Sequence, residues 1–122
     1  MMNSTSKPKA LIIDDQPDVA EILAFYMEEH FDSTICSDGS EALKRVSEEN
    51  WDLIISDLVM PQCSAKDLIA ARPDQTKPFV IVSGKSDTDP EVVSLLKAGA
   101  SLFVRKPIMS SQEFIAKLMA LM

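Results

Sequence analysis

Polar and charged residues stand at the ends of four short apolar segments, where their types and spacing could support chemistry. They are Asp14 and Asp15 after Ala10–Ile13, Ser56 and Asp57 after Leu53–Ile55, Ser83 after Phe79–Val82, and Lys106 two residues after Val104. If these segments are parallel strands, their carboxyl ends lie along one edge of a sheet, and a doubly wound sheet opens a crevice at that edge. We therefore expect three carboxylates, a hydroxyl group and an ammonium group to converge there.

Such a cluster has a specific chemistry. Three carboxylates within a few ångströms repel one another, and one of them would keep its proton unless a cation relieved the repulsion. Mg²⁺ suits this role because it accepts one or two carboxylates and a phosphate oxygen, whereas a single histidine, His30, and the lack of a Cys-x-x-Cys pair disfavour zinc. A carboxylate can attack phosphorus to give an acyl phosphate. Positive charge and hydrogen-bond donors, here Lys106 and Ser83, would then stabilise the phosphoryl oxygens.

The elements that must position these residues follow from the hydrophobic pattern. Each apolar segment precedes a stretch with apolar residues at helical spacing, which predicts five strand–helix pairs. Segments that are apolar throughout suit strands covered on both faces by helices, and hence a parallel sheet. Ser33–Cys36 instead alternates polar and apolar residues, as an edge strand does. With right-handed crossovers, we predict a flavodoxin-like, doubly wound α/β sandwich of three layers, with a parallel five-stranded sheet in the order 2-1-3-4-5.

Residues typical of helix ends support this division. Candidate helix starts are Pro17, Asp38 with Glu41, Ser64 with Asp67, Asp89 with Pro90, and Ser110 with Glu113. Gly99 stands where a glycine commonly ends a helix, and Pro73 follows the third expected helix.

Length and composition limit the class of protein. The 122 residues suit one domain, which we place at residues 9–122 after a disordered tail at residues 1–8. The net charge of −7 disfavours direct binding of nucleic acid or of anionic membranes. No apolar run approaches the ~20 residues that a membrane span needs. Two cysteines, Cys36 and Cys63, without a secretory signal favour a cytoplasmic location.

The ordered set of strand-end residues resembles the receiver domain of two-component response regulators, the CheY-like superfamily. The resemblance runs from Lys9 to Met122, and each motif stands at the end of an expected strand or beside one. The matching residues are Asp14-Asp15, Asp57 in Ser56-Asp57-Leu58-Val59-Met60-Pro61, Ser83 before Gly84, and Lys106-Pro107, with lesser matches at Asp38-Gly39-Ser40-Glu41-Ala42-Leu43 and Ala98-Gly99-Ala100.

The resemblance implies a role for each residue of the acidic cluster. Asp57 would be the phospho-acceptor. Asp15 and Asp57 would bind Mg²⁺ through their carboxylates, Asp14 through a water molecule, and Val59 through its backbone carbonyl.

The resemblance also implies a switch. Lys106 would pair with Asp57 and then with its phosphate, across a cis peptide bond to Pro107. Ser83 would turn toward the phosphoryl group, and Phe103 would follow by turning inward. Ala65 departs from the family pattern, which usually has glycine there, and this puts the shape of the neighbouring loop in question.

The implied function is that of a signalling module, which catalyses only its own phosphorylation and dephosphorylation. The phosphoryl donor would be a sensor histidine kinase or a phosphotransfer protein. The output would pass through the face formed by the fourth helix, fifth strand and last helix, to a downstream protein or a covalently linked effector domain. Homodimerisation on phosphorylation is compatible with this function, and the chain could be a stand-alone regulator or part of a longer one.

Three alternatives belong to other classes. A haloacid-dehalogenase-type phosphatase also forms an aspartyl phosphate, but it needs an acidic residue where this chain has Val59. A flavodoxin-type FMN carrier needs an anion-friendly first loop, and Asp14-Asp15 would repel the flavin phosphate. A degenerate receiver, which binds partners without phosphorylation, would not require the complete set of Asp15, Asp57, Ser83 and Lys106.

Overall fold

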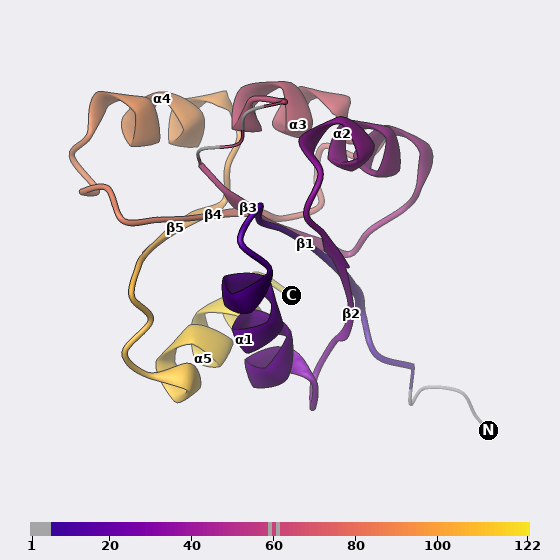
Figure 1. Ribbon diagram of the computed structural model, residues 1–122, viewed down its shortest axis with the longest axis vertical. Coiled ribbons are helices and arrows are strands. Elements are labelled where there is room, and N and C mark those ends of the chain that lie inside the picture. Colours follow the sequence, from indigo (N-terminus) through magenta and orange to yellow (C-terminus); the bar gives the residue numbers. More distant parts are fainter. Residues whose placement is uncertain (1–5, 59, 61) are drawn as a thin grey trace.

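A parallel five-stranded sheet forms the centre of the protein (Figure 1). The computed structural model describes residues 6–58, 60 and 62–122. The strands are β1 (Lys9–Ile13), β2 (Asp32–Cys36), β3 (Leu53–Asp57), β4 (Phe79–Ser83) and β5 (Leu102–Arg105). Their order is β2-β1-β3-β4-β5, with every neighbouring pair parallel, which confirms the predicted fold and strand order.

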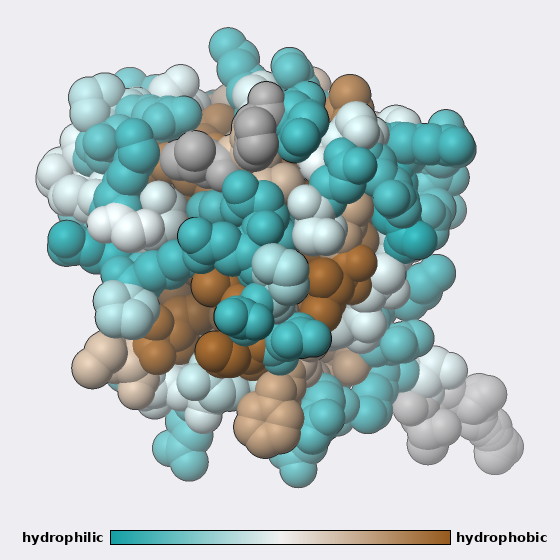
Figure 2. Space-filling view, in the orientation of Figure 1, coloured by the Kyte–Doolittle hydropathy of each residue, from teal (hydrophilic) through white to brown (hydrophobic). Residues whose placement is uncertain are grey.

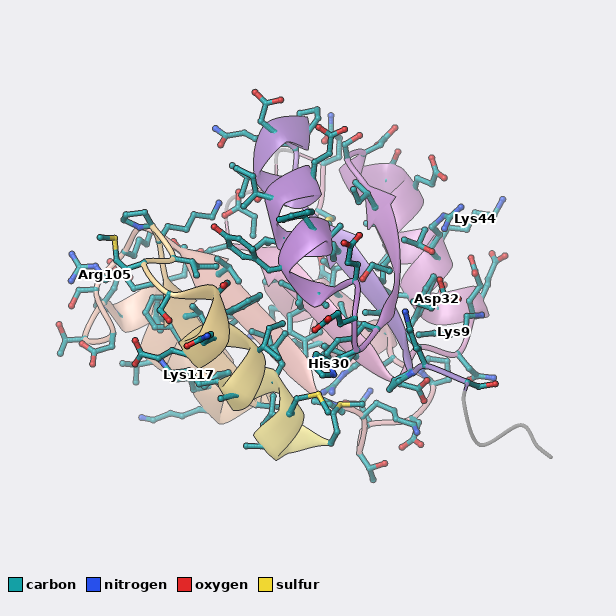
Figure 3. The ribbon with its side chains drawn as sticks, turned by 90° about the horizontal axis from the view of Figure 1, so that it is seen from below. Lys9, His30, Asp32, Lys44, Arg105 and Lys117 are labelled. Carbon is teal, nitrogen blue, oxygen red and sulfur yellow. The ribbon has the colours of Figure 1, made fainter. Side chains whose placement is uncertain are left out.

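Helices cover both faces of the sheet, which explains why most strands are apolar throughout. Helices α2 (Gly39–Glu48), α3 (Ala65–Ala71) and α4 (Pro90–Ala98) lie on one face, and α1 (Pro17–Met27) and α5 (Ser111–Leu121) lie on the other (Figure 1). Alternate residues of one strand therefore enter different cores: Leu11 and Ile13 pack on the α2–α3–α4 side, and Ala10 and Ile12 on the α1–α5 side. Seen from below in Figure 3, α1 and α5 lie side by side, and His30 lies at the end of α1 that leads to β2.

The helix starts are fixed by the side chains that the sequence singles out. Asp38, Ser64, Asp89 and Ser110 each accept a hydrogen bond from a backbone amide in the first turn of the helix that follows. Such caps satisfy amides that have no partner within the helix. Gly99 ends α4 with a φ of 126°, a left-handed conformation that a side chain would strain.

The edge strand and the third helix differ slightly from expectation. Strand β2 begins at Asp32, one residue earlier than the alternating pattern suggests, and it is more exposed than the central strands. Ala65 is the first residue of α3, and no residue other than glycine has a positive φ in the part of the chain that the structure describes. The alanine is therefore accommodated as a buried helical residue.

The part of the chain that the structure describes begins at Ser6, just before β1. Residues 1–5 of the expected tail lie outside the described residues, and the Pro8 carbonyl already accepts a hydrogen bond from the Asp32 amide (2.8 Å). The domain boundary at Lys9 stays a prediction. Among the described residues, no helix combines the length and apolar character required to cross a bilayer.

Candidate functional site

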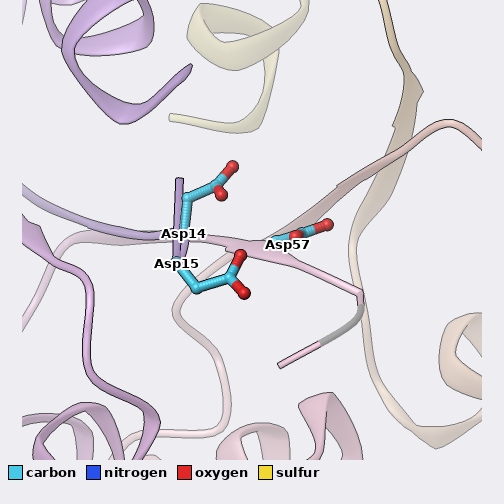
Figure 4. A group of neighbouring side chains, drawn as sticks. All are labelled: Asp14, Asp15 and Asp57. Atoms are coloured by element: carbon cyan, nitrogen blue, oxygen red, sulfur yellow. The ribbon is translucent and has the colours of Figure 1, made fainter. Parts of the chain in front are cut away.

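Three aspartates meet at the carboxyl edge of the sheet. Asp14 and Asp15 follow β1, and Asp57 is the last residue of β3, the neighbouring strand in which Ser56 pairs with Ile13 (Figure 4). One carboxylate oxygen from each aspartate lies within 4.8 Å of the others. The parallel register, which sets these strand ends side by side, brings together residues that are more than forty positions apart in the sequence.

Asp14 is the fixed member of the cluster. Its side chain is 2% exposed, and one carboxylate oxygen accepts a hydrogen bond from the Gln16 amide (2.9 Å) at the start of α1. Its own amide donates to the Cys36 carbonyl (3.1 Å) at the end of β2. Asp14 is therefore held from both sides by the backbone, whereas Asp15 is exposed.

Lys106 supplies the positive charge of the site. Its ammonium nitrogen lies 3.2 Å from Oδ2 of Asp14 and 3.6 Å from Oδ1 of Asp57. The Lys106 amide donates to the Ser83 carbonyl (2.8 Å), and the peptide bond to Pro107 is cis, as the resemblance implies. The resemblance implies that Lys106 pairs with Asp57 alone, and the structure adds the shorter contact of Lys106 with Asp14.

The donor set fits a hard divalent cation. The cluster gathers three carboxylate groups and one ammonium group, so acidic groups outnumber the basic group in it. The three aspartates offer carboxylate oxygens, which Mg²⁺ and Ca²⁺ prefer and which zinc sites seldom use alone. Val59, whose carbonyl is a predicted ligand, lies outside the described residues.

Ser83 lies on β4, the strand next to β3, and Phe103 lies on β5, the edge strand beyond β4. Ser83 ends β4 one residue after Val82, the register partner of Asp57, so its hydroxyl lies at the same edge of the sheet. Its side chain is buried, and its Oγ accepts a hydrogen bond from the Lys85 amide (3.2 Å). Phe103 on β5 pairs with Ile81 and packs, half-buried, against the core on the α2–α3–α4 side. The switch roles of both residues stay predictions.

Two contacts near the site are missed by reasoning from the sequence. Lys85 forms an ion pair with Glu91 in the first turn of α4 (3.2 Å), and the hydrogen bond to Glu91 raises the pKa of Lys85. Gly39, the first residue of α2, lies directly against Gln62 and Cys63 of the β3–α3 connection. Neither contact has a local sequence signal, because each depends on the packing of separate elements.

Comparison with known proteins places the chain in a family. The sequence model of the response regulator receiver domain matches residues 10–119. The chain belongs to this family. The receiver domain is 36% identical over 118 residues to the DNA-binding response regulator MtrA of Mycolicibacterium smegmatis, covering 95% of this chain and 51% of that protein. The chain thus spans about half the length of this relative.

Solved receiver domains share the architecture. The receiver domain of the Francisella response regulator 1452 is 30% identical, with a TM-score of 0.80 over 94% of this chain and 96% of that one. The receiver domain of a signal transduction histidine kinase from Syntrophus aciditrophicus is 31% identical, with a TM-score of 0.79 over 93% and 89%. Receiver domains are signalling modules, and they occur both in regulators and in kinases.

One expectation is wrong. The net charge of −7 predicts no direct binding of nucleic acid, yet several of the matching relatives are named DNA-binding response regulators. This chain matches only about half of such a relative. The charge of a single domain therefore gives no ground for excluding DNA binding by a protein that contains it.

Proposed function

We propose that this receiver domain accepts a phosphoryl group on Asp57 from a histidine kinase or a phosphotransfer protein, in a reaction that depends on Mg²⁺. The observation that carries the proposal is the meeting of Asp14, Asp15, Asp57 and Lys106 at one edge of the sheet. The catalytic action is limited to the domain's own phosphorylation and dephosphorylation.

Asp57 is the acceptor that the contacts favour among the three aspartates. Asp14 is nearly inaccessible, and its two carboxylate oxygens are engaged by Gln16 and Lys106. Asp15 is exposed, but the ammonium group of Lys106 contacts the other two carboxylates instead. The side chain of Asp57 is 13% exposed and has the ammonium nitrogen at 3.6 Å, so an incoming phosphoryl group would find both a nucleophile and a cation.

The reaction is a displacement at phosphorus. A carboxylate oxygen of Asp57 forms the new P–O bond while the bond from phosphorus to the imidazole nitrogen of a phosphohistidine breaks, and that nitrogen leaves with the electron pair. The ammonium group of Lys106, which contacts the Asp57 carboxylate, would then contact the phosphoryl oxygens. A bound Mg²⁺, held by Asp15 and Asp57 directly and by Asp14 through water, with the Val59 carbonyl as a further predicted ligand, would neutralise charge on the transferred group.

The donor has an apolar surface to dock on beside the acceptor. A groove of about 420 Å³ runs between α1 and the β5–α5 connection, and brown, apolar side chains gather in this part of the surface in Figure 2. Its lining is mostly apolar and includes Lys106; the residues are Val19, Ile22, Leu23, Tyr26, Val82, Lys106, Pro107 and Ile108. Because Lys106 belongs to both the groove and the acidic cluster, an amphipathic helix of the donor seated here would lie next to Asp57.

Phosphorylation would be transmitted through Ser83 and Phe103. The Ser83 hydroxyl would turn to the phosphoryl oxygens, and Phe103 would take a more buried position. These movements would alter the face formed by α4, β5 and α5, on which Leu96 is 39% and Met109, just before α5, is 88% exposed. Arg105 and Lys117, labelled in Figure 3, give β5 and α5 a basic component for a partner.

The proposal also includes the partner that receives the signal and the cellular location of the protein. The chain matches about half of each related regulator, so a covalently linked effector, such as a DNA-binding one, is compatible with the relatives' names. Free thiols at Cys36 and Cys63 support a reducing, cytoplasmic location.

The test is intact-mass analysis after incubation with acetyl phosphate, a small phosphoryl donor. Wild type, with Mg²⁺ and with EDTA, is compared with Asp57→Asn and with Asp52→Asn, a carboxylate at the opposite edge of the sheet that pairs with Lys77. We expect one phosphoryl adduct on wild type and on Asp52→Asn, with Mg²⁺ only, and none on Asp57→Asn. Labelling that is independent of Asp57 would refute the proposal.

A further inference from the structure

The turn between β2 and α2 contacts the chain segments on which the acidic cluster stands. At its start, the Cys36 carbonyl accepts a hydrogen bond from the amide of Asp14 (3.1 Å). At its end, Gly39 packs against Gln62 and Cys63, which belong to the connection that begins after Asp57. One short segment, residues 36–39, therefore contacts both of the chain segments that carry the aspartates.

The contact at Gly39 has no room for a side chain. A β-carbon placed on Gly39 would lie 3.0 Å from Cβ of Gln62, 3.2 Å from the backbone nitrogen of Cys63 and 3.3 Å from its sulfur. These separations are shorter than ordinary van der Waals contact. One of the three atoms is a backbone atom of the residue that precedes the α3 cap, Ser64, so it cannot move without moving the connection.

The backbone conformation of Gly39 does not require glycine. Gly99 is the only glycine with a positive φ in the described part of the chain, and Gly39 is an ordinary helical residue. Alanine favours a helix more than glycine does. The glycine is therefore explained by the close approach of the β3–α3 connection and not by local helix geometry.

We propose that Gly39 is a positioning residue for phosphoryl transfer. By lacking a side chain, it lets the first turn of α2 hold Gln62 and Cys63, and through them the connection that leads away from Asp57. The inference rests on the proposed function, because it concerns the same acceptor. The β3–α3 connection is also anchored on its inner side, where Met60 is buried in the same core as Cys36 and Ala65.

The substitution Gly39→Ala separates this role from helix stability. If only helix propensity mattered, alanine would leave labelling unchanged and would not lower the thermal midpoint. If the contact positions the acceptor, the displaced connection slows labelling by acetyl phosphate by about 10-fold, since small misplacements of reacting groups have large effects on rate.

Two further variants give the matched comparison. Gly99→Ala would strain a residue with a φ of 126° and would crowd Ile69 (3.3 Å), at the opposite edge of the sheet from the aspartates. It should lower the thermal midpoint and label at the wild-type rate. Adding Gln62→Gly to Gly39→Ala removes the closest contact, so the double variant should label faster than Gly39→Ala alone.

Initial rates of adduct formation and thermal midpoints would be measured for all four proteins at saturating Mg²⁺. The proposal is overturned if wild type labels and Gly39→Ala labels equally fast, if Gly99→Ala is slowed as much, or if the double variant gains nothing. If Gly39→Ala does not fold, Gln62→Gly alone loosens the contact from the other side, and a wild-type rate for it overturns the proposal. A wild type that does not label would instead refute the proposed function.

Discussion

Removing the charge of Asp57 should stabilise the metal-free protein. The acceptor lies within 4.8 Å of carboxylate oxygens of Asp14 and Asp15, and 3.6 Å from the ammonium nitrogen of Lys106. With an effective dielectric constant of ~20, each repulsion is at least about 3.5 kcal/mol and the attraction is about 4.6 kcal/mol. Among these four charges, two repulsions against one attraction leave about 2 kcal/mol that opposes folding.

Asp57→Asn removes this net repulsion while keeping the shape of the side chain. In EDTA and at low ionic strength, the thermal midpoint should rise by about 8 °C, taking ~4 °C per kcal/mol for a domain of this size. Sodium chloride should raise the midpoint of wild type more than that of the variant, because screening weakens repulsion between partly exposed charges.

Mg²⁺ should stabilise wild type more than Asp57→Asn. A ligand that binds only the folded state stabilises it by about 2.7 kcal/mol at a concentration 100 times its dissociation constant. Wild type should gain this stabilisation, and Asp57→Asn should gain much less because it lacks one carboxylate ligand.

The assay is differential scanning fluorimetry or calorimetry with and without Mg²⁺, with Asp52→Asn as the control. Asp52 pairs with Lys77 (3.5 Å) and accepts a hydrogen bond from the Lys9 amide (2.8 Å), so losing its charge should not stabilise the fold. A lower midpoint for Asp57→Asn in EDTA, or an equal response of both proteins to Mg²⁺, would refute the electrostatic reasoning.

Three other expected outcomes test the fold and its titrating groups. Ser110→Ala removes the cap that accepts from the Glu113 amide (3.1 Å), so urea denaturation should show a loss of about 1 kcal/mol, and an unchanged midpoint would contradict the capping role. Hydrogen bonds from Ser40 lower the pKa of Asp38, so the stability they give is present above the unfolded-state pKa and is lost as the pH falls through the lower folded-state pKa. Ser40→Ala should therefore lose less stability than wild type as the pH falls, and equal losses in the two proteins would contradict this. Burial raises the pKa of the Cys36 and Cys63 thiols, so iodoacetamide should alkylate both slowly at neutral pH and faster as the pH rises, with half-buried Cys63 ahead of Cys36; rapid neutral alkylation of either would contradict this.

The strands and their order could be predicted from the sequence because the physical signals are local or statistical. Segments that are apolar throughout require cover on both faces, and right-handed crossovers leave few topologies. The caps at Ser64 and Ser110 and the glycine at position 99 mark helix ends by their own chemistry. The meeting of Asp14, Asp15 and Asp57 also follows from parallel strands in this order, since their carboxyl ends share one edge and β1 lies next to β3.

The finer contacts could not be predicted, because they depend on side-chain placement between distant elements. Lys106 is 92 positions from Asp14, and only the folded arrangement makes Asp14 its nearer partner. The approach of Gly39 to Gln62 likewise has no signal in either segment. The prediction that the protein does not bind nucleic acid directly is wrong for another reason. Net charge is a property of this domain, and it says nothing about a domain joined to it.

The most direct test of the central claim is to locate the phosphoryl group. After labelling with acetyl phosphate and Mg²⁺, borohydride reduces an aspartyl phosphate to homoserine, and peptide mass spectrometry then identifies the converted position. We predict conversion at residue 57 alone, in the segment that follows Ser56, with Asp14 and Asp15 unchanged. Homoserine at either of those positions, or a stable phosphoserine at Ser56 or Ser83 in place of an aspartyl phosphate, would contradict the proposed function.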